Sequence, residues 1–412
     1  MSGRSARASM PGALRRPSDL RLERGARPRQ GSGADRSLLS WPSDFVRTQE
    51  DRDALIVLLH LSSLTAQRVL DLAHDHRSAA SCLEAVHRGE AASPADQWAA
   101  ASVRLPEVGA RMEAVDARLV AVGDPEYPPE LLDLFDPPAG LFVRGRPLEE
   151  LVPRVAMVGA RNCSPVGREV AGALASGLAR AGVCLVSGGA RGIDAAAHQG
   201  ALRAEGRTIS VLGCGIDIVY PGENRDLLQD VVAAGAVVSE YPPGTPAEPF
   251  RFPARNRIVA ALSRAVVVVE GATGSGSRIT AEHALDLGRE VFAVPGSVAS
   301  PLAAIPLDLI RDGATLVRGP DDLLSDLGLS PLPSNRMLEE DLDPGGVVGD
   351  RSLQQAERMV WAALTAPSAP DALARAAGLS LPEVVSALVG LEIRGQVRQV
   401  GGRYERRLEG SA

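Results

Sequence analysis

The run Ala265-Val266-Val267-Val268-Val269 consists of apolar residues alone. Six further short and mostly apolar runs alternate with helical stretches: 155–158, 183–186, 208–212, 236–238, 290–294 and 315–317. Strands that are apolar on both faces are typical of buried parallel sheets, and the intervening helices favour right-handed βαβ units. We therefore predict an α/β fold, a Rossmann-like doubly wound parallel sheet, with ligands bound beyond the carboxyl ends of its strands.

Arginines and aromatic rings are concentrated just before this run, in Phe250-Arg251-Phe252-Pro253 and then Ala254-Arg255-Asn256-Arg257. Aromatic residues make up only 3% of the chain, so a packed core does not account for this concentration. Guanidinium groups match phosphate oxygens, and ring faces stack on bases, so the stretch predicts a site for phosphate and base together. The alternative is a solvated helix start with one buried Phe.

Three loops that follow predicted strands are rich in small or hydroxyl residues: 159–165, 187–194 and 271–280. In the first loop Ser164 can cap a helix and Pro165 suits its first turn, which would leave free N–H groups beside Arg161. Because all three loops belong to one edge of the sheet, we predict a phosphate-lined surface there. The alternative is that they are ordinary turns between strands and helices.

Several kinds of chemistry are disfavoured by what the chain lacks. The first loop has no G-x-G-x-x-G, and a chain without lysine has no Walker-type ATP site. The four cysteines form no CxxC pair, and no cluster of His and carboxylate residues suggests a metal, so we expect neither a metal nor another cofactor. The formal net charge of −7 argues against coating nucleic acid through overall charge, but allows a local basic groove.

The composition changes along the chain and predicts five segments. Residues 1–45 contain nine arginines and predict a disordered basic arm, and residues 46–117 predict a small N-terminal helical domain. The Rossmann-like domain, with the connector that leads into it, covers 118–320, and an acidic linker covers 321–351. Three short helices and a hairpin within 352–408 predict a C-terminal winged helix. No apolar run approaches the ~20 residues that cross a bilayer, so we expect a cytoplasmic protein without a membrane partner.

Motifs throughout the central segment resemble those of the DNA processing protein A (DprA/Smf) family. They include Gly159-Ala160-Arg161, Ser239-Glu240-Tyr241-Pro242-Pro243-Gly244, Arg255-Asn256-Arg257-Ile258 and Gly288-Arg289-Glu290-Val291-Phe292-Ala293-Val294-Pro295-Gly296. The resemblance covers roughly 119–317. It implies a non-catalytic cytoplasmic protein that binds single-stranded DNA, forms homodimers and loads a RecA-type recombinase in natural transformation and DNA recombination.

The resemblance also implies which residues line the DNA groove. Five would contribute side chains, namely Arg161, Phe252, Arg255, Asn256 and Arg257. Six would contribute backbone or hydroxyl contacts, namely Ser187, Gly188, Ser275, Gly276, Ser277 and Thr280. The chain departs from the family at 305–308, where a Gly-x-Asn is usual, and at 61–64, where many members have a Pro-Gly-Val-Gly hairpin. We therefore expect neither the contact of that Asn nor a phosphate grip in the N-terminal segment.

The competing hypothesis is a nucleotide-binding hydrolase of the lysine-decarboxylase-like (phosphoribohydrolase) group. In that group a loop Gly-Gly-x-Gly-Thr is followed by a catalytic Glu. Aligning residues 274–277 with the loop puts Arg278 and Ile279 where the Glu is expected, and Glu282 falls on a different helical face. Hydrolysis is therefore not expected. A protein-interaction scaffold, the third hypothesis, leaves the arginine-rich stretch unexplained.

Overall fold

The computed structural model describes residues 40–90, 93–329, 355–393, 396–400 and 402–406. The chain divides into two compact units, Met1–Ser334 and Asn335–Ala412. Most of the predicted basic arm (1–39) and most of the predicted acidic linker (330–351) lie outside the described residues.

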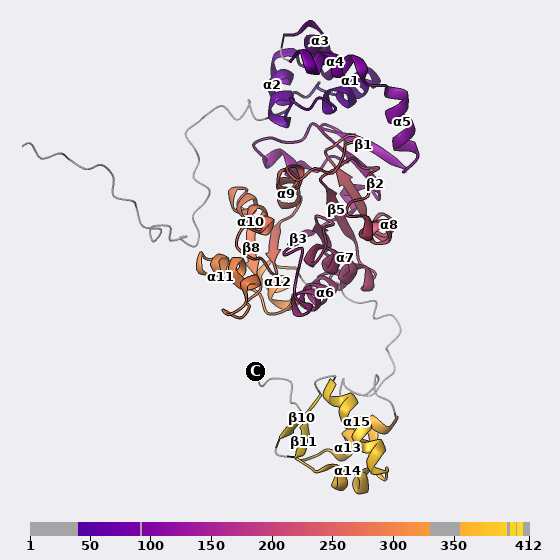
Figure 1. Cartoon of the computed structure of the whole chain (residues 1–412), viewed down its shortest axis with the longest axis vertical. Coiled ribbons are helices and arrows are strands. Elements are labelled where there is room, and N and C mark those ends of the chain that lie inside the picture. The colour runs from indigo at the N-terminus through magenta and orange to yellow at the C-terminus, as the bar shows by residue number, and fades with distance from the viewer. Residues whose placement is uncertain (1–39, 91–92, 330–354, 394–395, 401, 407–412) are drawn as a thin grey trace, which may run out of the picture. The chain divides into compact units, whose positions relative to one another are not determined.

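The first unit is built on a nine-stranded sheet with the order β1-β2-β6-β5-β4-β3-β7-β8-β9. Figure 1 labels β1, β2, β5, β3 and β8 of this sheet. The seven predicted strands are confirmed and are mutually parallel. They are β3 (Arg154–Val158), β4 (Cys184–Ser187), β5 (Thr208–Leu212), β6 (Ala236–Ser239), β7 (Ala265–Val268), β8 (Glu290–Ala293) and β9 (Thr315–Leu316). The chain runs outward from β3 to β6 and then returns to β7 on the other side of β3. Such a reversal is the switch point where open α/β sheets bind ligands.

Helices cover both faces of this sheet, as a doubly wound fold requires. Val155 and Met157 of β3 pack with α6 (Pro165–Arg180), α7 (Ile193–Arg203) and α12 (Pro320–Asp326), and α8 (Arg225–Ala234) covers an adjoining cluster. The alternate residues Ala156 and Val158 pack with α9 (Arg251–Ala261), α10 (Gly276–Asp286) and α11 (Ala304–Arg311). The short helices η4 (Leu148–Glu150), η5 (Gly222–Asn224) and η6 (Pro301–Ala303) complete the connections.

The proline-rich connector holds two strands that the sequence analysis did not predict. These strands, β1 (Ala117–Ala121) and β2 (Gly140–Gly145), are antiparallel to each other, and β2 pairs antiparallel with β6. Between them lies η3 (Pro129–Asp133). The prolines do prevent long helices here, but they stand outside the strands and leave the ladder hydrogen bonds intact.

The N-terminal helical region is confirmed and consists of α1 (Gln49–Leu59), α2 (Ala66–His76), α3 (Ala79–Arg88), α4 (Pro94–Ser102) and α5 (Leu105–Glu113). Leu55 and Leu58 belong to the same hydrophobic cluster as Val120 and Leu141 of the sheet. Short helices cannot bury their apolar faces alone, so this region shares a core with the sheet. In the turn at 61–64, Ser63 donates its N–H and its hydroxyl to the carboxylate of Asp96.

The second unit is a winged helix, as predicted. It contains α13 (Gln355–Ala363), α14 (Pro370–Ala377), α15 (Leu381–Ile393) and the hairpin of β10 (Val397–Val400) with β11 (Arg403–Arg406). Its core includes Val360, Leu373, Leu388 and Val397. No single helix in the described ranges is long and apolar enough to cross a membrane, and α14 and α15 reach that length and composition only as a pair bent by 107°.

Candidate nucleic-acid interface

Two adjoining pockets of about 680 and 350 Å³ lie at the carboxyl ends of β3, β4 and β7. They share Arg161, Asn162, Gly188, Ala190 and Arg255. We call the combined depression the strand-end groove. Its walls are the loops that follow the three strands and the first turns of α9, so it lies at the switch point of the sheet.

The smaller pocket contains two aromatic rings and a cation. Tyr220 stacks on Phe252 with 5.1 Å between ring centroids and an interplanar angle of 30°. The guanidinium carbon of Arg161 lies 5.2 Å from the centroid of Phe252. Arg161 is exposed and Phe252 is half-buried. A base can therefore stack on the exposed part of this cluster, either on a ring or on the guanidinium plane.

The larger pocket contains the N-terminus of α10. Ser275 caps this helix by accepting a hydrogen bond from the N–H of Ser277, and its hydroxyl lies 3.0 Å from the Ser277 hydroxyl. The side-chain amide of Asn256 donates to the carbonyl of Gly276 at 3.2 Å and so joins the loop to α9. No carboxylate is bonded to this helix start among the described residues. Its positive end is therefore open to an anion in the groove.

The start of α6 differs from its prediction, because Glu270 already occupies it. The N–H of Ser164 donates to Glu270 Oε2 at 2.9 Å, and the Ser164 hydroxyl donates to Oε1 at 2.6 Å. A Cβ on Gly167 would lie only 2.3 Å from the carboxyl carbon. The expectation of free N–H groups at this helix end is therefore wrong, since a carboxylate of the chain itself takes the place of a ligand.

In the loop after β4, backbone N–H groups likewise donate hydrogen bonds to a carboxylate of the chain itself. Asp194 accepts hydrogen bonds from the N–H groups of Gly188 at 3.1 Å and Ala190 at 3.4 Å. Gly192, with a φ of +75°, brings this loop against the loop after β3, where an added Cβ would lie 2.2 Å from the carbonyl oxygen of Ala160. Only glycine fits such an approach. Of the three loops, the one after β7 thus offers the open helix start.

Most residues predicted to line the groove are brought together. The lining includes Arg161, Gly188, Phe252, Arg255, Asn256, Ser275, Gly276, Ser277 and Thr280. Ser187 is an exception, because it is fully buried and its hydroxyl donates to the carbonyl of Met157 at 2.7 Å. The prediction that Ser187 contacts DNA is therefore corrected: its side chain stabilises the sheet beneath the groove.

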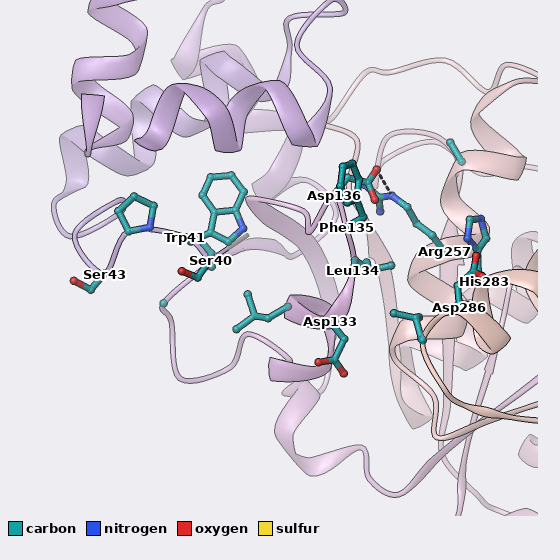
Figure 2. A pocket seen from close by; sticks show the side chains of 16 residues that line it. Ser40, Trp41, Ser43, Asp133, Leu134, Phe135, Asp136, Arg257, His283 and Asp286 are labelled. Carbon is teal, nitrogen blue, oxygen red and sulfur yellow. Dashed lines mark hydrogen bonds and ion pairs between the residues drawn. The ribbon is translucent and has the colours of Figure 1, made fainter. Parts of the chain in front are cut away.

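Arg257 is the second exception. Its Nε lies 3.0 Å from Asp136 Oδ2 and its Nη2 lies 2.7 Å from Glu240 Oε1, and the residue is buried. It lines a different cleft, shown in Figure 2, where a dashed line joins it to Asp136. Residues two positions apart point about 200° apart around a helix, so Arg255 and Arg257 cannot face the same side. The prediction that Arg257 lines the DNA groove is thus corrected.

Arg255 contributes to the groove mainly by holding its parts together. Its Nη1 donates to the carbonyl of Gly188 at 2.6 Å and to that of Val211, and its Nε donates to Asn256 at 3.2 Å. Burial lowers the pKa of Arg255 while Asp194 opposes that shift, and an arginine so placed stays charged at neutral pH. Arg255 therefore fixes α9 to the loop after β4 and to strand β5, and adds positive potential at the groove floor.

Tyr220, Asn162 and Arg191 are among the lining residues that were not predicted from sequence as site residues. Tyr220 lies between β5 and η5 and reaches the groove by stacking on Phe252 of α9. The available sequence signal was an aromatic residue directly before a proline, in a chain with only 3% aromatic residues; in the structure Tyr220 is 43% exposed. Arg191 is exposed and forms an ion pair with Glu223 at 2.7 Å.

The acidic residues and histidines considered as candidates for catalysis each have a defined place in the structure. Asp194 is the one carboxylate among the described residues that line the groove, and that group is held by backbone N–H groups. His198 is fully buried and hydrogen-bonded to Thr208 at 2.7 Å, and burial lowers its pKa to about 3. Glu282 is paired with Arg278 on the exposed face of α10. In the described part of the chain, no group of three or more His, Cys, Asp or Glu is arranged to hold a metal ion.

Comparison with known proteins identifies the family. The model of the family "DNA recombination-mediator protein A" matches residues 118–328, and that of the "DprA winged helix domain" matches 349–403. The chain belongs to the DNA recombination-mediator protein A (DprA/Smf) family. The family resemblance predicted from sequence is thus confirmed.

Three relatives show how far this similarity extends. "Protein Smf" of Synechocystis is 37% identical over 313 residues, which is 69% of this chain and 79% of that protein. "DNA processing protein DprA" of Bacillus subtilis is 39% identical over 225 residues, which is 54% and 76%. The X-ray structure of DNA processing protein A from Streptococcus pneumoniae aligns with a TM-score of 0.60 and 34% identity over 68% of this chain and 99% of that one. The similarity to these proteins thus extends beyond the Rossmann-like sheet.

Proposed function

We propose that the chain binds single-stranded DNA in the strand-end groove and does so without catalysis. The observation that supports this most is the cluster of Arg161, Phe252 and Tyr220 in the same groove as the open start of α10. Stacking surfaces take bases of any sequence, while a guanidinium and helix N–H groups take phosphates. The family's description as a recombination mediator agrees with such a ligand.

We infer further that the bound strand is passed to a RecA-type recombinase during DNA recombination and natural transformation. The support is the family and the names of its relatives, several of which are DNA processing proteins. A homodimer and a cytoplasmic location belong to the same proposal. The winged helix is proposed to serve a partner protein or regulation, since α15 carries no arginine or lysine and exposes Leu381, Val385 and Val389.

A titration tests the proposed binding. Fluorescence anisotropy of a labelled oligothymidine should show binding that weakens as salt increases, because each phosphate contact releases counterions. The absence of binding, or binding indifferent to salt, would contradict the proposal. Incubation with nucleoside monophosphates tests the hydrolase alternative, and release of free base would establish it.

Replacing Arg161 by alanine should remove one phosphate contact. The slope of log K against log salt should become shallower by about 0.7, and all sequences should be weakened alike. Arg180→Ala is the matched control, since this exposed arginine ends α6 at the opposite edge of the sheet. Equal salt slopes for Arg161→Ala and the unaltered protein would show that Arg161 does not contact a phosphate.

A further inference from the structure

A second large cleft, of about 1090 Å³, lies between the segment 40–43, the loop 132–136 and helices α9 and α10. Figure 2 shows Trp41 on one side of it and Arg257, His283 and Asp286 on the other. Its apolar surface includes Trp41, Leu132 and Phe135. Phe135 is 71% exposed, so its ring is accessible to a ligand in the cleft. Trp41, Leu132 and Phe135 do not line the strand-end groove.

Negative charge predominates in this cleft. Asp133, Asp136 and Asp286 line it, and Glu240 lies behind Arg257. Arg289 forms an ion pair with Asp133 at 2.6 Å, and the single guanidinium group of Arg257 forms ion pairs with both Asp136 and Glu240. Asp286 forms no ion pair within the described ranges. Burial lowers the pKa of His283, although Asp286 opposes the shift, so its ring adds little positive charge at pH 7.

Three carboxylates and one guanidinium group line the cleft, and with the partners Glu240 and Arg289 counted as well, two negative charges remain unbalanced. An anionic ligand is disfavoured by this excess. A guanidinium suits the cleft better than other groups, because it pairs bidentately with a carboxylate and also stacks on aromatic faces. The cleft therefore has the chemistry to bind an arginine-rich peptide.

The chain supplies such a peptide at the edge of the cleft. Residues 1–39 contain nine arginines against three acidic residues, and they join the described structure at Ser40, which lines the cleft. A segment attached there has an effective concentration near the millimolar range, so contacts that are weak one by one suffice for occupancy. Reach is not limiting, since an extended chain spans about 3.3–3.6 Å per residue.

We propose that this cleft binds the chain's own arginine-rich segment, residues 1–39, through Asp133, Asp286 and the rings of Trp41 and Phe135. The proposal does not depend on the DNA groove. Its consequence is that the nine arginines are held away from nucleic acid while the cleft is occupied, so the segment adds little to DNA affinity.

Brief digestion of the full chain with trypsin tests this proposal, with mass spectrometry following cleavage at the arginines of residues 1–36. Asp133→Asn combined with Asp286→Asn should accelerate cleavage there by about tenfold, as expected for release of a tethered segment. Phe135→Ala, which removes an exposed ring and no charge, should also accelerate it. Asp226→Asn with Asp230→Asn, an equal change of charge on the exposed face of α8, should leave the rate unchanged.

Equal cleavage rates in the unaltered chain and in both cleft variants would overturn the proposal. Protection that disappears on dilution would also overturn it, because the occupant would then be the segment of a second copy. Circular dichroism of each variant guards against a rate change caused by unfolding, and acceleration by Phe135→Ala in a fully folded protein supports the proposal even if the double variant is destabilised.

Discussion

Arg257→Ala should lower the unfolding free energy of the first unit by about 3 kcal/mol while leaving the DNA affinity of the folded protein unchanged. Removing one partner of a buried ion pair costs about 3–5 kcal/mol, because it leaves an uncompensated charge. The lower end applies here, since the Glu240 side chain is 15% exposed but the Asp136 side chain is 36% exposed and is partly rehydrated. Urea unfolding and oligothymidine anisotropy measure the two quantities.

Arg180→Ala again serves as the control, because this exposed arginine has no comparable burial. It should change the unfolding free energy by less than about 0.5 kcal/mol. A stable Arg257→Ala protein with weakened DNA binding would contradict the placement of this arginine outside the groove.

Phe252→Ala should have the largest effect on binding. Loss of a stacking surface costs about 1–3 kcal/mol per base, which corresponds to roughly 5–150-fold in affinity, and the salt slope should stay nearly the same because no charge is removed. Phe250→Ala is the matched control, since this ring stands two residues earlier, is 66% exposed and does not line the groove. Anisotropy at several salt concentrations gives both affinity and slope.

A role for Phe252 in the core alone predicts a different result. If Phe252 served only as a core ring, its truncation would cost about 3–5 kcal/mol of stability and leave affinity intact. A strongly lowered melting temperature without a loss of affinity would therefore contradict the proposed role. Equal losses of affinity in Phe250→Ala and Phe252→Ala would contradict it as well.

The parallel strands could be predicted because burial on both faces leaves a continuous apolar run, as in β7. The strands β1 and β2 could not, because they lie between prolines and one of them carries Arg118 opposite Val143. Strands of this kind have a mixed pattern that also suits a connector. The sharing of a core between Leu55 and Leu141 was likewise invisible, since it depends on how distant segments pack.

The site was predictable where a local motif determines it and unpredictable where distant groups meet. The glycine and hydroxyl loops were identified from the sequence, but Glu270 lies 106 residues from Ser164 along the chain and fills the start of α6. Tyr220 and Phe252 are also far apart along the chain, and only the fold brings their rings together. The placement of Arg257 was misjudged because a motif was carried over whole, although helical geometry already separates Arg255 from Arg257.

Photochemical cross-linking of an oligothymidine to the full chain, followed by mass spectrometry, tests the proposed DNA site most directly. Ultraviolet light joins thymine to residues that it contacts, so the proposed groove predicts cross-links at Tyr220, Phe252 or their immediate neighbours. These cross-links should be lost in Arg161→Ala at raised salt and kept in Arg257→Ala. Cross-links confined to α15, or to the cleft around Trp41, would contradict binding in the strand-end groove.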